Sequence, residues 1–464
     1  MNKKSALIVM LAAVSGCSLT PTYQRPVAPV SAAWPVSAAV KPGQASRMPD
    51  WQAYFTDPRL QVLISASLEH NRDLRIATAR ISEARAQYGI VQADRLPNVN
   101  LSAQRAASLS PANTSFTGNP FRVQRYDVSA NLVSFELDFW GRVASLNEAA
   151  RASFLATESA QRAFQLSLIS DVANAYLSVL ELNERSALAQ ATAKGRSDML
   201  SLIGQRRDVG IASDLDLLQA EGSYQAAVAD QANLQQQLAA AENLLDSLVG
   251  QTPAQLPAGR ELSQQAIAAD WIADVPSEVL LRRPDVIAAE QRLIASNASI
   301  GAARAAFLPR ISLTGALGTA SRQLGGLFGA GSQAWSFQPA LTLPLFDAGR
   351  NSANLDVSRA RNVIAVAEYE KTIQQAFREV ADLLSARDSL TRQLSAQQAN
   401  SHTQQQRLKL VEARYRAGVA NYLELLDAER DAYAAQQGEL QVRRAQLTAF
   451  TQLYKALAGD TKVN

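Results

Sequence analysis

The feature that most constrains this chain is an internal duplication with a nearly constant offset. Three separated landmarks recur, and they are Arg206–Glu221 with Arg414–Glu429, Gly141-Arg142 with Gly349-Arg350, and Pro97 with Pro309. The first two pairs are offset by 208 residues and the third by 212 residues. Because self-similarity at a fixed spacing indicates repeated structural units, two halves of about 210 residues should share one plan.

Within each half the hydrophobic pattern changes from a helical period to alternation. Leu74, Ala77, Ile81 and Ala84 are spaced like one face of a helix ahead of Pro97. Strict apolar–polar alternation then follows each proline, and four strands are expected: two that begin near Val99 and Arg310, then Tyr126–Leu137 and Trp335–Phe346. Loops rich in Gly, Ser, Asn and Pro join them. Each half therefore contributes a β-hairpin, over residues 97–137 and 309–346.

Long helical segments follow both hairpins. After Gly141 and Gly349 the helical pattern runs to Gly210 and Gly418, which at about 1.5 Å per residue is on the order of 100 Å of helix. A return helix with a coiled-coil seam follows in each half. Gly210 and Gly418 are expected at the turns, since glycine enters the left-handed region without steric cost.

The N-terminus reads as an export signal that ends at a lipid-attachment site. Asn2-Lys3-Lys4 is followed by a short apolar region and then by Val14-Ser15-Gly16-Cys17, which resembles a bacterial lipobox. We expect a signal peptide over residues 1–16, a lipid on Cys17, and an extended segment over 17–58. The alternative is an ordinary exported protein with an incidental cysteine.

The composition excludes several classes of function. The chain has two histidines and one cysteine, so neither a Cys/His metal cluster nor a disulfide framework is expected. A net charge of +3 gives no electrostatic footprint for nucleic acid. The mature chain lacks an apolar run of the roughly 20 residues that a spanning helix needs. We therefore expect no enzyme, no metal, no nucleic acid and no cofactor besides the covalent lipid.

The strands have about the length of tilted transmembrane strands, near ten residues each. A soluble β-layer that caps a helical bundle would show the same alternation, and the lipobox favours the outer membrane. Four strands cannot close a barrel, and an open edge is not tolerated in lipid, so chains must associate. Two copies would give eight strands, whose interior fills with side chains. Three copies would give twelve strands, which can leave a lumen. Trp335 and Phe337 are candidates for an interfacial aromatic girdle.

At this point the sequence resembles the outer membrane efflux protein family, the TolC-like channels, and within it the OprM/NodT lipoprotein branch. The segments that carry the resemblance are the lipobox at Cys17, Pro21–Pro26 (PTYQRP), Glu136–Arg142 (ELDFWGR), Arg283-Pro284-Asp285, Ile300–Thr314, Leu343–Arg350 (LPLFDAGR) and Asn421–Arg430 (NYLELLDAER). The resemblance implies a homotrimer in which a shared twelve-strand β-barrel continues into a periplasmic α-helical barrel. It covers essentially all of the mature chain.

The resemblance also implies the organisation and the partners. Residues 59–250 would form the first repeat, 251–275 an equatorial linker, 276–459 the second repeat and 460–464 a tail. The protein would be a passive exit duct in the outer membrane that extends into the periplasm. Its partners would be a periplasmic adaptor and an inner-membrane resistance-nodulation-division (RND) transporter, and its cargo small molecules such as drugs, toxic compounds or metal ions. The alternatives are a type I secretion duct and a periplasmic coiled-coil scaffold without a pore.

The candidate functional residues lie at the tips of the helical hairpins. By resemblance, the periplasmic gate comprises Tyr415, Leu423, Glu424, Asp427 and Arg430, with Asp214, Asp216 and Glu221 matching through the internal repeat. In a trimer one Asp becomes a ring of three, whose carboxylates would favour cations. The expected adaptor-docking residues are Gly210, Ala212, Gly418 and Ala420. Asp138 and Asp347 are expected to cap helices, and Arg282 and Arg283 to be structural.

Overall fold

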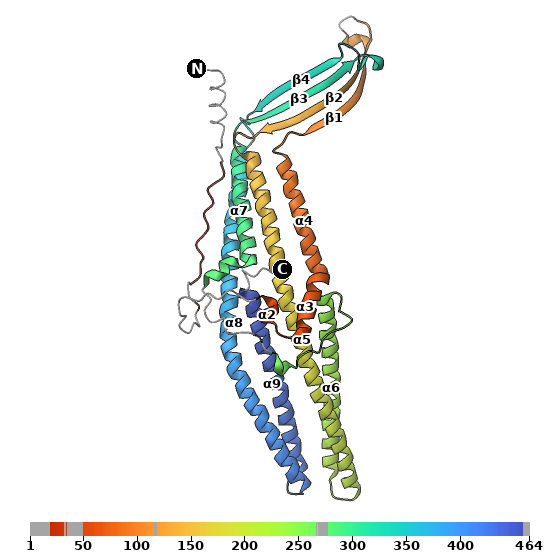
Figure 1. Cartoon of the computed structure of the whole chain (residues 1–464), viewed down its shortest axis with the longest axis vertical. Coiled ribbons are helices and arrows are strands. Elements are labelled where there is room, and N and C mark those ends of the chain that lie inside the picture. The colour runs from red at the N-terminus through yellow and green to blue at the C-terminus, as the bar shows by residue number, and fades with distance from the viewer. Residues whose placement is uncertain are drawn as a thin grey trace. The chain divides into compact units, whose positions relative to one another are not determined.

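A computed structural model of the chain describes residues 19–31, 34, 50–115, 118–265, 267 and 277–457. The expected signal peptide, the lipidation site at Cys17 and the tail 460–464 lie outside these residues. The chain divides into two compact units, 1–27 with 80–158 and 288–370, and 28–79 with 159–287 and 371–464. The fold is a mixture of long α-helices and one small β-sheet, as the sequence predicts (Figure 1).

The first unit contains a four-stranded antiparallel sheet whose strand order is β1-β2-β3-β4. The strands are β1 (Val99–Ser110), β2 (Phe121–Leu137), β3 (Arg310–Ser321) and β4 (Gln333–Thr342). Short 3-10 turns lie in the two hairpin loops, at Ala112–Thr114 (η1) and Leu324–Gly326 (η5). β4 ends four residues before the expected Phe346, because its partner β3 begins at Arg310, which pairs with Thr342, the last residue of β4.

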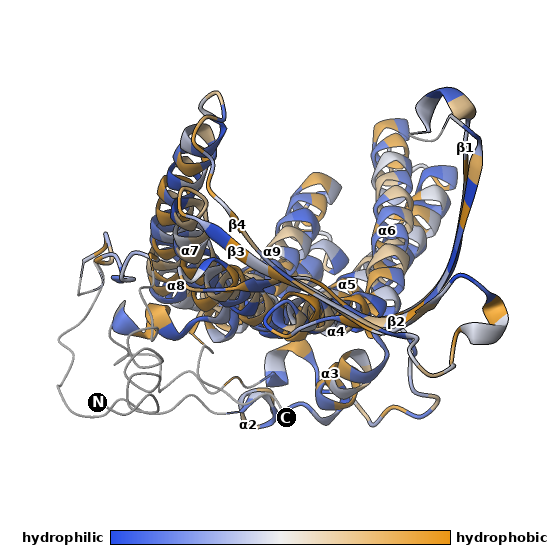
Figure 2. Ribbon diagram, turned by 90° about the horizontal axis from the view of Figure 1, so that it is seen from above, coloured by the Kyte–Doolittle hydropathy of each residue, from blue (hydrophilic) through white to orange (hydrophobic). Residues whose placement is uncertain are grey.

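The register of the strands gives the sheet one apolar and one polar face, since side chains alternate between faces. The apolar face carries Val99, Leu101, Ala103, Val128, Ala130, Leu132, Ile311, Leu313, Leu317, Trp335, Phe337 and Leu341. The polar face carries Asn100, Ser102, Gln104, Asp127, Ser129, Asn131, Ser312, Thr314, Ser336 and Gln338. Figure 2 shows hydrophobic and hydrophilic residues interspersed along the strands. Leu101, Leu317 and Trp335 are 80%, 68% and 77% exposed in the single chain, so nothing in the chain itself covers the apolar face there.

The helices of the two repeats have matching lengths. Those of the first half are α2 (Trp51–Tyr54), α3 (Pro58–His70), α4 (Arg72–Ala93), α5 (Arg142–Asp208) and α6 (Asp214–Val249). Those of the second half are α7 (Pro284–Ala305), α8 (Arg350–Arg416) and α9 (Tyr422–Leu457), with 3-10 turns at Leu262–Gln264 (η2) and Ser277–Arg282 (η4) before them. Both α5 and α8 have 67 residues, and both α6 and α9 have 36.

The second unit is built around a buried aromatic and aliphatic core. Tyr54 lies 4.7 Å from Tyr454 and 5.0 Å from Phe55 between ring centroids, and all three rings are at most 1% exposed. Asp57 caps α3 by accepting a hydrogen bond from the Arg59 amide, with an N–O distance of 2.8 Å. Residues of α5 such as Ile169 and Val172 pack into the same core.

One helix in the described part of the chain, α5, is long and apolar enough to cross a membrane by length and composition. Half of its most apolar stretch is buried inside the fold. Ile169, Val172 and Ala173 of α5 are fully buried, which is the pattern of a core helix.

Candidate functional site

The two helical hairpins turn at glycines in the left-handed conformation. Gly210 and Gly418 both have φ of 76°. At each turn an amide just past the glycine donates back into the last helical turn: Ile211 to the Arg206 carbonyl at 2.8 Å, and Val419 to the Arg414 carbonyl at 3.0 Å. The turns therefore use glycine for the reason expected from the sequence.

The first turn is closed by a capping box. The Ser213 hydroxyl accepts a hydrogen bond from the Asp216 amide at 3.1 Å, and the Asp216 carboxylate accepts one from the Ser213 amide at 3.1 Å. Asp216 is thus engaged at the start of α6. Asp214 is 87% exposed and lies 4.0 Å from the Arg207 guanidinium, and Glu221 is also exposed.

The second turn is closed by a cap and by an ion pair. The Asn421 side chain accepts a hydrogen bond from the Glu424 amide at 2.8 Å. Arg414, in the last turn of α8, donates to the Glu424 carboxylate at 2.9 Å. Glu424 therefore joins the end of α8 to the start of α9, while Leu423 beside it is 52% exposed.

The two tips pack on each other through a small core. Its buried members are Ile203, Ala220, Val411, Tyr415, Tyr422, Leu425 and Ala428. Tyr415 is only 9% exposed, its ring lies 6.3 Å from that of Tyr422, and Arg206 stands over it at 5.2 Å. This candidate gate residue therefore packs between the hairpins within the single chain.

Asp427 and Arg430 lie one turn apart on α9. An Arg430 nitrogen is 3.4 Å from an Asp427 oxygen and 3.7 Å from an Asp431 oxygen. The side chains of Arg430 and Asp427 are 69% and 44% exposed, so the pairing is a solvated one worth under about 1 kcal/mol. Both side chains are accessible to another molecule.

Apolar side chains are exposed around both turns. They are Val209, Ile211, Leu215 and Leu218 at the first turn and Val419 and Leu423 at the second, each more than half exposed. Ala212 and Ala420 are partly buried against the core shared by the tips. An exposed apolar patch of this kind indicates an interaction surface.

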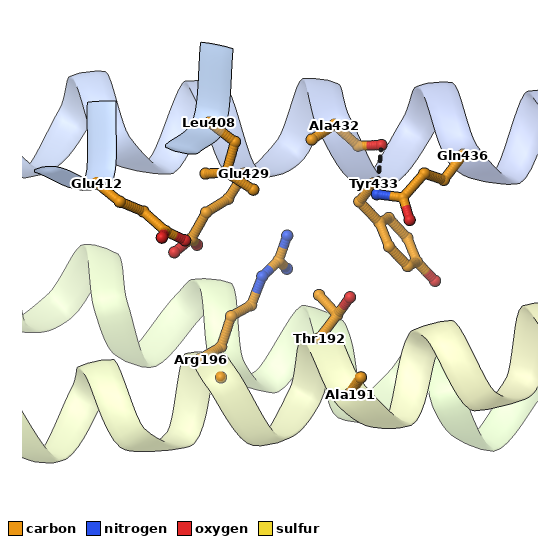
Figure 3. A pocket seen from close by; sticks show the side chains of 10 residues that line it. Ala191, Thr192, Arg196, Leu408, Glu412, Glu429, Ala432, Tyr433 and Gln436 are labelled. Carbon is orange, nitrogen blue, oxygen red and sulfur yellow. Dashed lines mark hydrogen bonds between the residues drawn. The ribbon is translucent and has the colours of Figure 1, made fainter. Parts of the chain in front are cut away.

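A cavity between the hairpins was missed by the sequence reasoning. It has a volume of about 250 Å³ and lies between α5 and the α8–α9 hairpin, and Figure 3 shows Arg196 extending from α5 toward Glu429. Arg196 also donates to the Ser223 carbonyl at 3.0 Å. Burial raises the pKa of Glu429, Arg196 opposes the rise, and Glu412 adds to it. Its repeat counterpart Glu221 is exposed, so the repeat alone gave no signal of this environment.

Polar contacts beside this cavity hold α9 against the first hairpin, and one of the residues involved, Tyr433, also lines the cavity. Tyr433 donates to the Asp230 carboxylate on α6, and Arg185 on α5 donates to the Gln437 side chain. Glu181, 3% exposed, accepts from Arg185 at 2.9 Å and lies 3.1 Å from the Arg444 guanidinium. These contacts hold α9 against both α5 and α6.

The junctions between strand and helix use the capping expected from the sequence. Asp138 accepts a hydrogen bond from the Ala144 amide at 2.7 Å, and Asp347 accepts one from the Asn351 amide at 2.9 Å. The sequence did not predict the ion-pair cluster beside them. Glu136 at the end of β2 binds Arg142 and Arg310, each at 2.7 Å.

The segment that follows the expected lipidation site is fastened to α7. Glu290, 6% exposed, accepts two hydrogen bonds from Arg25 at 2.7 Å each and one from Tyr23 at 3.0 Å. Asn297 donates to the Pro21 carbonyl at 2.7 Å. Gly301 permits the approach, because a Cβ there would lie 2.1 Å from the Thr20 hydroxyl oxygen. Leu19, the first described residue, is two positions from Cys17.

Arg283 has a structural role, as expected. It is 7% exposed and donates to Asp285 at 2.8 Å, to Glu379 at 2.9 Å and to the Ala456 carbonyl at 3.0 Å. Burial alone would raise the pKa of Asp285, but the bonds from Arg283 outweigh it and hold that pKa below its ordinary value. Among the described residues no group of three or more His, Cys, Asp or Glu side chains is arranged to hold a metal ion.

Comparison with known proteins gives a consistent result over the whole chain. The family described as outer membrane efflux protein matches residues 63–251 and 275–459. The outer membrane protein OprJ of Pseudomonas aeruginosa is 43% identical over 456 residues, 98% of this chain and 95% of OprJ. The toluene efflux pump outer membrane protein TtgF of Pseudomonas putida is 43% identical over 462 residues, 97% of this chain and 96% of TtgF.

Solved structures share the fold. A membrane protein from Pseudomonas aeruginosa superposes with a TM-score of 0.87 at 42% identity, covering 95% of this chain and 100% of that one. The open state of the MtrE outer membrane channel of Neisseria gonorrhoeae superposes with a TM-score of 0.86 at 37% identity, covering 95% of this chain and 98% of MtrE.

Proposed function

This chain belongs to the outer membrane efflux protein family, and on that premise we propose that it is the exit duct of a tripartite RND-type efflux system. It conducts small molecules passively from the periplasmic pump to the exterior. The family consists of efflux ducts and not of enzymes. Curated relatives are named for toluene and for antibiotics, which supports a cargo of small organic molecules.

The observation that carries this proposal is the two-faced sheet. Its apolar face presents Trp335, Phe337 and Leu341 on β4 and Ile311 and Leu317 on β3, while polar side chains line the other face. A spanning β-barrel needs an apolar exterior and tolerates a polar, water-filled interior. The exposed apolar face would be unfavourable in water and is favourable in lipid.

The edges of the sheet support assembly into a homotrimer. β1 and β4 are both edge strands, so each chain leaves two unpaired ladders. Lipid does not tolerate unpaired backbone groups, and joining β4 of one copy to β1 of the next satisfies both edges. Three copies give twelve strands, which close around a lumen.

A lipid on Cys17 would hold the chain in the same membrane. The contacts of Tyr23 and Arg25 with Glu290 fix the following segment on α7. Cys17→Ser should abolish labelling by a radioactive fatty acid, while trimers still form because the barrel spans the membrane. Labelling that persists in Cys17→Ser would exclude the lipobox.

The helical-hairpin tips would dock a periplasmic adaptor, which in turn binds the inner-membrane RND transporter. The exposed apolar side chains around Gly210 and Gly418 support this assignment. Cysteines placed at Ala212 or Ala420 should crosslink to the adaptor. Crosslinking at Gly118 or Gly329, in the loops between strands, would instead reverse the orientation.

The gate would lie on α9 near the second turn. Asp427 and Arg430 are accessible and pair only weakly within the chain, which leaves them available for the copies beside them. Asp427→Ala should weaken cation preference, because it removes a ring of carboxylates. Arg430→Ala should raise the open probability. Unchanged selectivity and open probability would make these residues ordinary solvated charges.

Single-channel recording of the purified protein in planar bilayers tests the duct itself. A duct gives stepwise ion conductance, whereas a periplasmic scaffold gives none. A type I secretion duct would also conduct, so export is measured as a second step. Drug accumulation in cells that lack their own outer-membrane duct should fall when this chain and its partners are expressed, and protein export without drug export would favour the alternative.

A further inference from the structure

The apolar face of the sheet carries two arginines, Arg105 and Arg122, toward the end of the strands that is near the loop between β1 and β2. Arg105 pairs with Tyr126, and Arg122 pairs with Leu109, which places both arginines on the same face as Leu101. They are the charged residues of this face in β1–β4. The other charged strand residues alternate to the polar face, and they are Arg125, Asp127, Glu136 and Arg310. The apolar face therefore carries two positive charges and no carboxylate.

Arg105 is held in place on this face. It donates to the Gln124 side chain at 3.1 Å, and its guanidinium carbon lies 5.6 Å from the centroid of the Tyr126 ring. A cation over an aromatic ring is stabilised by the ring's quadrupole. Because this contact restricts the side chain in advance, less entropy is lost when a ligand binds the remaining N–H donors.

The height of Arg105 matches the boundary of a membrane. Tyr126, its cross-strand neighbour, pairs in turn with Ser321 at the end of β3. From Ile311 to Ser321 the strand rises about 33 Å, which at a tilt near 40° is about 25 Å along the membrane normal. That is the height of the lipid-facing apolar band of outer-membrane barrels. Arg105 then lies at the level of the lipid headgroups on the side of the membrane away from the helices. Arg122 pairs with Leu109, four residues farther along β1 in the same direction.

We propose that Arg105 and Arg122 form a binding site for the phosphate groups of anionic lipids in the outer leaflet. Guanidinium groups bind phosphate through paired N–H donors, and no carboxylate on this face competes for them. The aromatic ring of Tyr126 suits the same interfacial level. This inference rests on the proposed function, since it requires that the sheet span the membrane.

Spin-labelled lipids test the site in the full chain. The protein is reconstituted into phosphatidylcholine vesicles that contain a trace of spin-labelled phosphatidic acid or spin-labelled phosphatidylcholine, and the immobilised fraction is measured. The wild type should prefer phosphatidic acid. Arg105→Gln and Arg122→Gln should each lower this preference, by up to about fivefold, and the double variant should lower it further. Arg105→Lys should retain part of the preference.

Arg125→Gln is the matched control, because it removes the same charge from β2, the strand that carries Arg122, but on the polar face. An equal loss in Arg125→Gln would show a response to net charge and overturn the site. Displacement of the lipid by millimolar inorganic phosphate would show a soluble-anion site and overturn its assignment to lipid. Vesicle flotation separates the two proposals. The Cys17→Ser variant is used because the anchoring lipid alone would make the protein float. A Cys17→Ser variant that fails to float refutes the membrane-spanning duct, whereas one that floats without preferring phosphatidic acid refutes this inference alone.

Discussion

Helices α6 and α9 are repeat counterparts of equal length that differ in burial. Both have 36 residues, follow a helix of 67 residues and begin after a glycine turn with φ of 76°. Yet α6 has five buried residues and α9 has thirteen. The duplication thus preserves length and turn geometry while the environments of the two helices have diverged.

The difference arises from what each helix packs against. The last turns of both helices enter the core of the second unit, through Leu245 and Val249 of α6 and Tyr454 of α9. The core between the tips is less even, because α9 contributes Tyr422, Leu425 and Ala428 to its buried members and α6 contributes Ala220. Leu215, Leu218 and Leu244 of α6 are each more than half exposed. If the protein assembles as proposed, this exposed apolar face of α6 is available to another copy of the chain, whereas on α9 the large apolar side chain that is more than half exposed is Leu423, beside the turn.

Truncating one leucine in each helix should give the largest contrast. Leu425 on α9 is 1% exposed and Leu218 on α6 is 64% exposed. Leu425→Ala should lower the free energy of unfolding by about 2–5 kcal/mol, because it removes buried surface and leaves a cavity. Leu218→Ala should change the free energy of unfolding by no more than about 0.5 kcal/mol. Unfolding followed by circular dichroism measures both. Equal losses in the two variants would remove the difference in burial as an explanation.

The turn glycines should respond alike, because this feature is common to both hairpins. A Cβ at Gly210 or Gly418 would meet nothing within 4 Å, so only the backbone conformation resists it. Gly210→Ala and Gly418→Ala should each cost about 1–2 kcal/mol. A much larger loss at one turn, measured by the same unfolding assay, would show that the turns are not equivalent.

The helix caps should have smaller effects. Ser213→Ala removes the capping box of α6, and Asn421→Ala removes the cap of α9, each at a cost of about 1 kcal/mol. The exposed Arg414–Glu424 pair should contribute less, so Glu424→Gln is the control. Finding that Glu424→Gln costs more than either cap would assign the second turn to its ion pair.

The smallest effect should depend on pH. Burial raises the pKa of Glu429, so the folded chain holds this proton to a higher pH than the unfolded chain does. Stability contributed by the protonated form is therefore lost as the pH rises above the ordinary carboxyl range. Glu429→Gln should raise the melting temperature at pH 8 relative to the wild type and leave it unchanged at pH 4. The exposed counterpart Glu221→Gln should change it at neither pH.

Much of the architecture could be predicted because it depends on local pattern. Alternating residues after Pro97 and Pro309 predict the strands, and the glycines at 210 and 418 predict the turns, since a left-handed residue and a period of two are properties of short segments. The end of β4 lies at Thr342 and not at the predicted Phe346, since it depends on where its partner β3 begins, at Arg310, and not on the pattern within β4.

The site could be predicted in part. The capping roles of Asp138 and Asp347 follow from their place before a helix, and the structure has both carboxylates accepting helix amides. The buried carboxylate of Glu290 and the cavity beside Glu429 were missed. Their partners are Arg25 and Arg196, more than 200 residues away in the chain, and no spacing rule connects such positions.

By itself the sequence determined the duplicated plan, the helix lengths, the turns and the alternation that gives the sheet two faces. The tertiary structure decided which repeat counterpart is buried, because burial depends on which elements meet and not on the period within each one. It also decided which candidate gate residues are buried: Tyr415 lies in the core between the tips, while Asp427 and Arg430 remain accessible on α9. Local periodicity fixes the direction of a side chain, and only packing fixes what it faces.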